Sequence, residues 1–321
     1  MHTTMRMCGH SLNTEVARSG RNPSSSQRAR PQLHGGIQCG NVLRSEPVTA
    51  LTGGRRPSHG RRTALVMLAA LVAIASCRSN IDSATQPKRI VDLSPPLTEI
   101  SSCRQLGRHM CELLGIPARL RFAPVTPQKP HFSFGLMTFT LLSHGGAHLD
   151  APGRLLRDGL AADQVPLDRF YGPARIWDIR WHDRNTPLEI NDLEQMPEIQ
   201  PGTVLLLFSG YAPPADDDWP TYTWLSPQAA TWLAQKPLRA LATDMPSIGS
   251  FQQTWSLLER DRQPEEVWAE RIPFFRAGIP IIEGLTNLDQ LEHEEHITFA
   301  GFPLAISDRT GAPMRAVALV Y

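Results

Sequence analysis

The chain has 321 residues, of which 41% are hydrophobic and 20% charged, and its formal net charge is +1. This composition excludes disorder over the whole length, because disordered chains combine low hydrophobicity with high net charge. Residues 1–62 carry ten arginines and two glutamates, so the rest of the chain holds 22 basic and 29 acidic side chains. An acidic main body without a basic stripe argues against nucleic acid as a partner.

The N-terminal part of the chain has the features of an exported protein. Residues 1–60 are rich in Ser, Gly, Pro and Arg and have no apolar period, which predicts disorder or an extension ahead of the true translation start. Residues 61–77 then combine two arginines, an apolar run too short to span a bilayer, and small residues before Cys77, as in a secretory signal. The end of this segment is similar to the lipobox of bacterial lipoproteins, which predicts a lipid anchor on Cys77. Cleavage after Ala75 without lipidation, or a plain buried helix, are the alternatives.

The rest of the chain, residues 78–321, has no second low-complexity linker and is predicted to form one domain. Ser226 followed by Pro227 is typical of a helix N-cap and first turn. The almost wholly apolar segment 203–208 predicts a central strand. Strands interleaved with a few helices give an α/β or α+β fold. The other strands are expected at residues 89–93, 136–142, 174–179, 238–242, 279–282 and 315–320, the first of them buried.

Two cysteines follow Cys77, and their state depends on whether a helix forms around them. Leu106, Met110 and Leu113 follow helical spacing within residues 101–114, which also contain Cys103 and Cys111. Eight residues of helix rise about 12 Å, beyond the Cα separation of about 7 Å that a disulfide tolerates. A complete helix therefore leaves both thiols free, whereas an incomplete one permits a disulfide in an oxidising compartment.

The strongest motif is His144-Gly-Gly-Ala-His148-Leu-Asp150-Ala-Pro152. The apolar run before it suggests that the strand continues through it, and the paired glycines argue against a helix. Because side chains alternate along a strand, His144, His148 and Asp150 are expected on the same side. Two imidazoles and a carboxylate suit Zn²⁺ or Mn²⁺, so this segment predicts a metal site. Satisfied polar residues at a strand end are the alternative.

This motif resembles the signature His-x-Gly-Thr-His-x-Asp-x-Pro of the cyclase family of metal-dependent hydrolases, which includes bacterial kynurenine formamidase and isatin hydrolase. Ala147 stands where that family has threonine. The resemblance covers most of residues 89–321 and implies a mixed β/α fold, a swivelling β/β/α domain that assembles into homodimers or larger homo-oligomers. Five further blocks resemble the family, at residues 90–96, 201–211, 243–247, 277–288 and 302–318.

The resemblance also implies roles for single residues. His144, His148 and Asp150 match ligands of a first metal, and Glu283 matches a downstream carboxylate ligand. Arg154 stands where the family has an acid–base histidine, and Arg271 stands where a histidine binds a second metal. Arginine stays protonated and offers no lone pair, so neither residue can replace imidazole. A guanidinium can, however, supply the positive charge that paired carboxylates need. The sequence therefore predicts a site with one metal ion, in which Arg271 lies in or near the place of the second metal.

Together these features predict an exported hydrolase, periplasmic or membrane-anchored, that opens the amide or lactam C–N bond of a small molecule. Substrates similar to N-formylkynurenine or isatin follow from the resemblance alone. Glu283, Arg154 and Arg271 are the candidate catalytic residues: Glu283 by ligation or proton transfer, and the arginines by steadying negative charge. The alternative is a catalytically inactive protein of the same fold that binds a small anionic ligand on the two arginines.

Overall fold

The computed structural model describes residues 86–98, 108–116, 121–125, 135–214, 219–307 and 310–321. The expected N-terminal extension, signal segment and Cys77 lie outside these residues, and so does Cys103. Among the helices that are described, none combines the length and the apolar character needed to cross a membrane.

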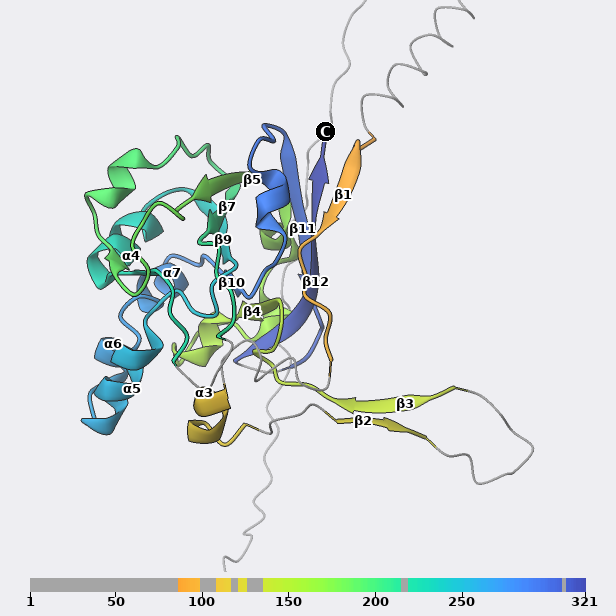
Figure 1. Cartoon of the computed structure of the whole chain (residues 1–321), viewed down its shortest axis with the longest axis vertical. Coiled ribbons are helices and arrows are strands. Elements are labelled where there is room, and N and C mark those ends of the chain that lie inside the picture. Colours follow the sequence, from red (N-terminus) through yellow and green to blue (C-terminus); the bar gives the residue numbers. More distant parts are fainter. Residues whose placement is uncertain (1–85, 99–107, 117–120, 126–134, 215–218, 308–309) are drawn as a thin grey trace, which may run out of the picture. The chain divides into compact units, whose positions relative to one another are not determined.

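An eight-stranded mixed sheet organises the described part of the chain (Figure 1). Its last strand, β4, pairs with β10 and also with β12, so the sheet closes on itself in a barrel-like form. The neighbours from β5 to β10 run parallel, and all other neighbouring pairs of this sheet are antiparallel. In spatial order the strands are β1 (Arg89–Asp92), β12 (Gly311–Val320), β11 (Ile297–Pro303), β5 (Tyr171–Asp178), β7 (Thr203–Phe208), β9 (Leu238–Thr243), β10 (Ile281–Glu283) and β4 (His148–Asp150).

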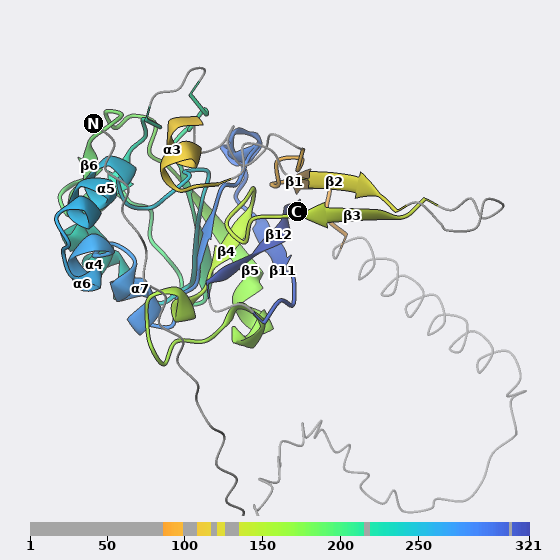
Figure 2. The ribbon, with the colours of Figure 1, turned by 90° about the horizontal axis from the view of Figure 1, so that it is seen from below.

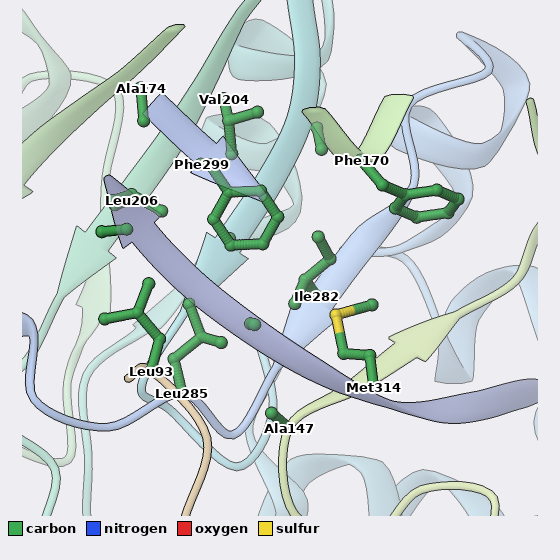
Figure 3. Packing of buried hydrophobic residues seen from close by; sticks show 14 of the residues in the cluster. Leu93, Ala147, Phe170, Ala174, Val204, Leu206, Ile282, Leu285, Phe299 and Met314 are labelled. Carbon is green, nitrogen blue, oxygen red and sulfur yellow. The ribbon is translucent and has the colours of Figure 1, made fainter. Parts of the chain in front are cut away.

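Two hydrophobic cores lie on the two faces of this sheet. Along β7, Val204 and Leu206 join the core enclosed by the sheet, whereas Leu205 and Leu207 join the core under the helices. Figure 3 shows the enclosed core, with Leu206 packed near Phe299. Side-chain alternation places successive residues in different cores, which explains why a strand covered on both faces is apolar throughout. Each fully buried leucine contributes about 1.5–3 kcal/mol.

Helices cover the outer face of the parallel strands (Figures 1 and 2). Ser226 caps α4 because its Oγ accepts a hydrogen bond of 3.1 Å from the Ala229 amide. Ala230 and Leu233 of α4 pack with Phe274 of α7 in the outer core. The described helices are α3 (Arg108–Leu113), α4 (Pro227–Ala234), α5 (Phe251–Glu259), α6 (Pro264–Val267) and α7 (Ile272–Arg276), with 3-10 turns η1 (Pro152–Arg154), η2 (Ala162–Gln164), η3 (Leu167–Phe170), η4 (Asp192–Gln195) and η5 (Leu288–Leu291).

Two short sheets complete the described structure. One joins β2 (Arg121–Pro124) to β3 (Met137–Thr140) as an antiparallel pair (Figure 2). The other joins β6 (Pro187–Leu188) to β8 (Trp224–Leu225) in parallel. The predicted strand 136–142 therefore exists only as β3, and it belongs to the small sheet rather than to the large one.

Most of the predicted elements are confirmed, with corrections at their ends and in their burial. The strand 203–208 and the helix that begins at Pro227 lie where the sequence places them. The first strand is buried on one face only: Val91 and Leu93 join the enclosed core, whereas Ile90 is 63% exposed. Strand β11 and helix α5 were not predicted. Cys111 is disulfide-bonded, so the alternative that leaves its thiol free is wrong.

Candidate functional site

Adjacent strands β4 and β10 bring three of the predicted site residues together. Their antiparallel register places Glu283 opposite His148, and Ile281 opposite Asp150. Leu149 points into the enclosed core, so alternation turns His148 and Asp150 to the helix-covered face. Both carboxylates are buried, Asp150 completely and Glu283 with 2% of its side chain exposed. Two negative charges in such a place need nearby cations.

His144 reaches this cluster from a turn and not from a strand. Residues 143–147 form a bend in which Gly146 has φ +66°, a backbone conformation that does not occur in a strand. The expectation of one continuous strand through His144 is therefore wrong, although His144 and His148 still converge. Their rings meet edge to face, with centroids 5.1 Å apart, and His144 Nδ1 lies 2.7 Å from Asp150 Oδ1.

Arg271, at the N-cap of α7, joins the two buried carboxylates. Its Nε donates to Asp150 Oδ2 at 3.0 Å, and its Nη2 donates to Glu283 Oε1 at 2.9 Å. Nη2 also donates to Ser247 Oγ at 2.9 Å, and the Ile248 amide donates to the same Glu283 oxygen at 2.8 Å. Nη1 has no hydrogen-bond partner among the described residues. Arg271 thus bridges the two carboxylates and keeps one nitrogen unengaged.

Arg154 supplies a second guanidinium, from the end of η1. Its Nη1 donates to both oxygens of Asp150, at 2.6 and 2.7 Å, and lies 3.4 Å from His144 Nδ1. The side chain of Arg154 is 23% exposed, against 2% for Arg271. Trp268 lies beside both guanidinium groups, with its ring centroid 5.3 Å from Cζ of Arg154 and 5.4 Å from Cζ of Arg271.

Electrostatics set the protonation of the cluster. Burial lowers the pKa of His144 and outweighs the opposing effect of Asp150, so His144 is neutral near pH 7. Burial also opposes protonation of His148, but the facing carboxylates of Glu283 and Asp150 outweigh it and raise the pKa of His148. Burial would raise the pKa of Asp150, but Arg154 and His144 outweigh it and hold that pKa well below its usual range. The two carboxylates thus favour the positively charged form of His148.

These residues fit one divalent metal ion. His148 Nδ1 donates to the Gly146 carbonyl at 2.9 Å, so in the neutral ring Nε2 carries the lone pair. Nε2 is buried without a hydrogen-bond partner among the described residues. Ligand atoms of His144, His148 and Asp150 lie within 4.8 Å of one another. Tetrahedral Zn²⁺ spaces its ligands by about 3.3 Å, so the three ligand atoms lie near the separation that one shared ion requires.

A cavity of about 180 Å³ opens onto this cluster. His144, His148, Arg154, Arg271 and Glu283 line its polar side, and its apolar side includes Leu114, Leu142 and Phe251. Cavities of about 150 Å³ hold a benzene ring. The site therefore accommodates a small molecule with one aromatic ring, placed against charged groups.

The sequence did not reveal every residue of the site. Ser247 lies in a block that resembles the family, but its contact with Arg271 joins residues 24 positions apart and has no local signal. Trp268 also has no local sequence signal for a site, because an aromatic residue in a helical region is usually part of the core. Its role became visible only from its place beside two guanidinium groups.

Replacing Gly146 with alanine tests how far the turn positions His148. We expect a loss of about 1–2 kcal/mol of stability from a non-glycine residue with positive φ, because left-handed backbone is strained. An added Cβ would also lie 2.7 Å from Leu97 Cδ2. Gly115→Ala is the matched control, since its φ is +63° and a Cβ there meets nothing within 4 Å. Zinc affinity should fall in Gly146→Ala alone; an equal fall in both variants would contradict a role for the turn.

Comparison with known proteins defines the class to which this fold and site belong. Residues 91–250 match the family model described as "Putative cyclase". A kynurenine formamidase from Salinibacter ruber is 31% identical over 189 residues, which cover 58% of this chain and 80% of the relative. One from Bordetella avium is 27% identical over 233 residues, 72% of this chain and 97% of the relative. The chain belongs to the cyclase family, as its motifs predicted.

Solved structures confirm the mixed α/β fold. Isatin hydrolase A from Labrenzia aggregata, bound to benzyl benzoate, matches with a TM-score of 0.56 and 20% identity, over 77% of this chain and 99% of that chain. A "predicted metal-dependent hydrolase" from Bacillus stearothermophilus matches with a TM-score of 0.51 and 20% identity, over 72% and 97%. At these identities the likeness shows the fold alone.

Proposed function

We propose that this protein is a metal-dependent hydrolase that opens an amide or lactam C–N bond in a small aromatic substrate. The observation that carries the proposal is the convergence of His144, His148 and Asp150 at a cavity wide enough for one aromatic ring. Relatives named kynurenine formamidase and fold neighbours named isatin hydrolase support this substrate class. N-formylkynurenine, simple aryl formamides and isatin are the substrates to test.

In this proposal His144, His148 and Asp150 hold one Zn²⁺ or Mn²⁺. Glu283 is close enough to assist by ligation or by taking a proton. A bound ion supplies Lewis acidity and lowers the pKa of water toward about 7. Arg271 already bridges Asp150 and Glu283 with two nitrogens. A second metal between these carboxylates would have to displace a guanidinium that is almost completely buried. The proposed content is therefore one ion per chain.

The remaining groups of the site have complementary roles in the proposal. Arg271 lines the cavity and its Nη1 has no partner among the described residues, so Arg271 is the proposed donor to the oxygen of the scissile carbonyl as it gains negative charge. Glu283 Oε1 is held by Arg271 and the Ile248 amide, while Oε2 lies 3.6 Å from His148 Nε2. That second oxygen is the proposed acceptor of a proton from the attacking water and its donor to the leaving nitrogen.

Export, lipidation at Cys77 and assembly into a homodimer or larger oligomer remain part of the proposal. The disulfide at Cys111 supports an oxidising compartment, because structural disulfides are rare in reducing ones. Mass spectrometry of the mature protein tests the first two points. An N-terminus at Cys77 with added acyl mass is expected, whereas an intact residue 1 on a cytoplasmic protein would contradict them.

Asp150→Asn is expected to abolish both metal binding and hydrolysis, because it removes the charged member of the His–His–Asp set. The parent should contain about one metal ion per chain by elemental analysis and should hydrolyse an aryl formamide or isatin. Asp178→Asn is the matched control: Asp178 pairs with Arg180 at the surface and lies outside the cavity, so metal content and rate should stay unchanged.

A non-catalytic binding protein is the second candidate function, and one observation favours it. Arg154 and Arg271 already balance the charges of Asp150 and Glu283. A parent protein that contains no metal, turns over neither substrate and binds benzoate would support this alternative.

A further inference from the structure

We propose that Arg154 and the metal ion compete for Asp150, and that an anionic group on the substrate resolves the competition by capturing Arg154. Metal binding and binding of an aromatic carboxylate are then coupled, and the preferred substrates are amides or lactams that carry an acidic group. This inference rests on the proposed function and further specifies that the preferred substrate is an anion.

The first step concerns the acceptor capacity of Asp150. A carboxylate offers about four lone-pair sites. Arg154 Nη1 contacts both oxygens, His144 Nδ1 lies 2.7 Å from Oδ1, and Arg271 Nε donates to Oδ2. All four sites are therefore engaged, and Asp150 can bind a metal only if one of these groups leaves.

Arg154 is the group that can leave. Arg271 is held by further contacts with Ser247, Glu283 and Trp268, and its side chain is only 2% exposed. His144 is itself a candidate ligand. Arg154 is 23% exposed, and among the described residues Asp150 is the carboxylate with which it forms an ion pair. Releasing Arg154 therefore breaks fewer interactions than releasing Arg271 would.

The second step concerns charge. Asp150 and Glu283 carry two negative charges, which Arg154 and Arg271 balance. Adding a divalent cation leaves the site with an excess of two positive charges if Arg154 stays beside Asp150. Uncompensated charge in a buried place is costly, so metal binding favours both the withdrawal of Arg154 and the arrival of an anion. A carboxylate on the substrate meets both needs.

The third step is the destination of the released guanidinium. Arg154 lines the cavity, and its Cζ lies 5.3 Å from the ring centroid of Trp268. Cation–π attraction to this ring keeps the guanidinium close to the site after it leaves Asp150. From there it can form two parallel hydrogen bonds with a carboxylate held against the apolar wall of the cavity. Arg154 is thus the proposed specificity determinant for an acidic substrate.

Zinc titration of the full chain against a chromophoric chelator, with and without benzoate, tests the coupling. Benzoate should raise the zinc affinity of the parent at least fivefold, since couplings between sites are typically 5–150-fold. Neutral benzamide should not. In Arg154→Gln the zinc affinity without benzoate should exceed that of the parent about tenfold or more, and benzoate should no longer change it. Arg154→Lys, which keeps the charge, should retain part of the benzoate effect.

Arg180→Gln provides the matched control, because Arg180 pairs with Asp178 and Glu292 away from the cavity. It should behave as the parent does. Equal zinc affinity in the parent and Arg154→Gln, or equal effects of benzoate and benzamide, would overturn the competition and leave the metal site intact. Absence of zinc binding from every variant would overturn the proposed function, and this inference with it.

Discussion

Arg271→Met is expected to lower the free energy of unfolding by about 3–5 kcal/mol, the range for breaking a buried ion pair by removing one partner. The guanidinium lies between two buried carboxylates, at 3.0 Å from Asp150 Oδ2 and 2.9 Å from Glu283 Oε1. Methionine fills much of the same volume but supplies neither charge nor hydrogen bonds. Asp150 keeps Arg154, whereas Glu283 loses the guanidinium with which it pairs.

Urea denaturation of the parent and the variant measures this loss, and a double variant identifies its cause. Glu283→Gln in the Arg271→Met background removes the uncompensated charge, so it should recover part of the lost stability. Arg276→Met is the matched control, because Arg276 ends the same helix with an exposed side chain. Its effect should stay within about 0.5 kcal/mol. No recovery in the double variant would mean that Arg271 stabilises through packing rather than charge.

The sequence predicted well the elements that have a strong local pattern. Segment 203–208 is apolar at every position but the first, and Ser226-Pro227 marks a helix start without any information from elsewhere in the chain. It could not predict how the sheet closes, because the pairing of β4 with β12 joins residues such as Leu149 and Ala312 that are far apart in the sequence. The burial of strand β1 was predicted only in part for the same reason: its apolar residues do not show that Val91 and Leu93 join the core while Ile90 stays exposed.

The same difference between local patterns and long-range contacts applies to the candidate site. The spacing of His144, His148 and Asp150 is local, so the sequence could identify these residues even though the expected strand is a turn. The approach of Glu283 depends on strand register, and that of Arg271 on a helix N-terminus more than a hundred residues away from Asp150. These contacts entered the prediction only through the family resemblance. The resemblance also placed the cation of Arg154 beside these carboxylates, but its contact with both oxygens of Asp150, from which the competition with metal is inferred, is seen only in the structure.

Arg154→His is expected to raise the turnover of a neutral aryl formamide by about 10²–10⁴-fold, the usual contribution of a general acid–base group. Arg154 lines the cavity, and its guanidinium has only hydrogen-bond donors, so it cannot accept a proton from water. An imidazole titrates near neutral pH, where an acid–base group is most efficient, so it would supplement Glu283, the proposed base of the parent. The substitution also removes the cation that contacts both oxygens of Asp150, which frees that carboxylate for a metal.

Arg154→Gln separates these two effects, because glutamine removes the cation without adding a base. Steady-state rates of all three proteins, each loaded with zinc to the same content, give the comparison. If proton transfer limits the parent, Arg154→His should be faster than Arg154→Gln, and its rate should fall at acid pH as the new imidazole becomes protonated. Equal rates for the two variants would show that the base is supplied elsewhere, with Glu283 as the nearest carboxylate on the cavity wall. For a substrate with an acidic group the order should reverse, because Arg154 holds the carboxylate that histidine and glutamine release.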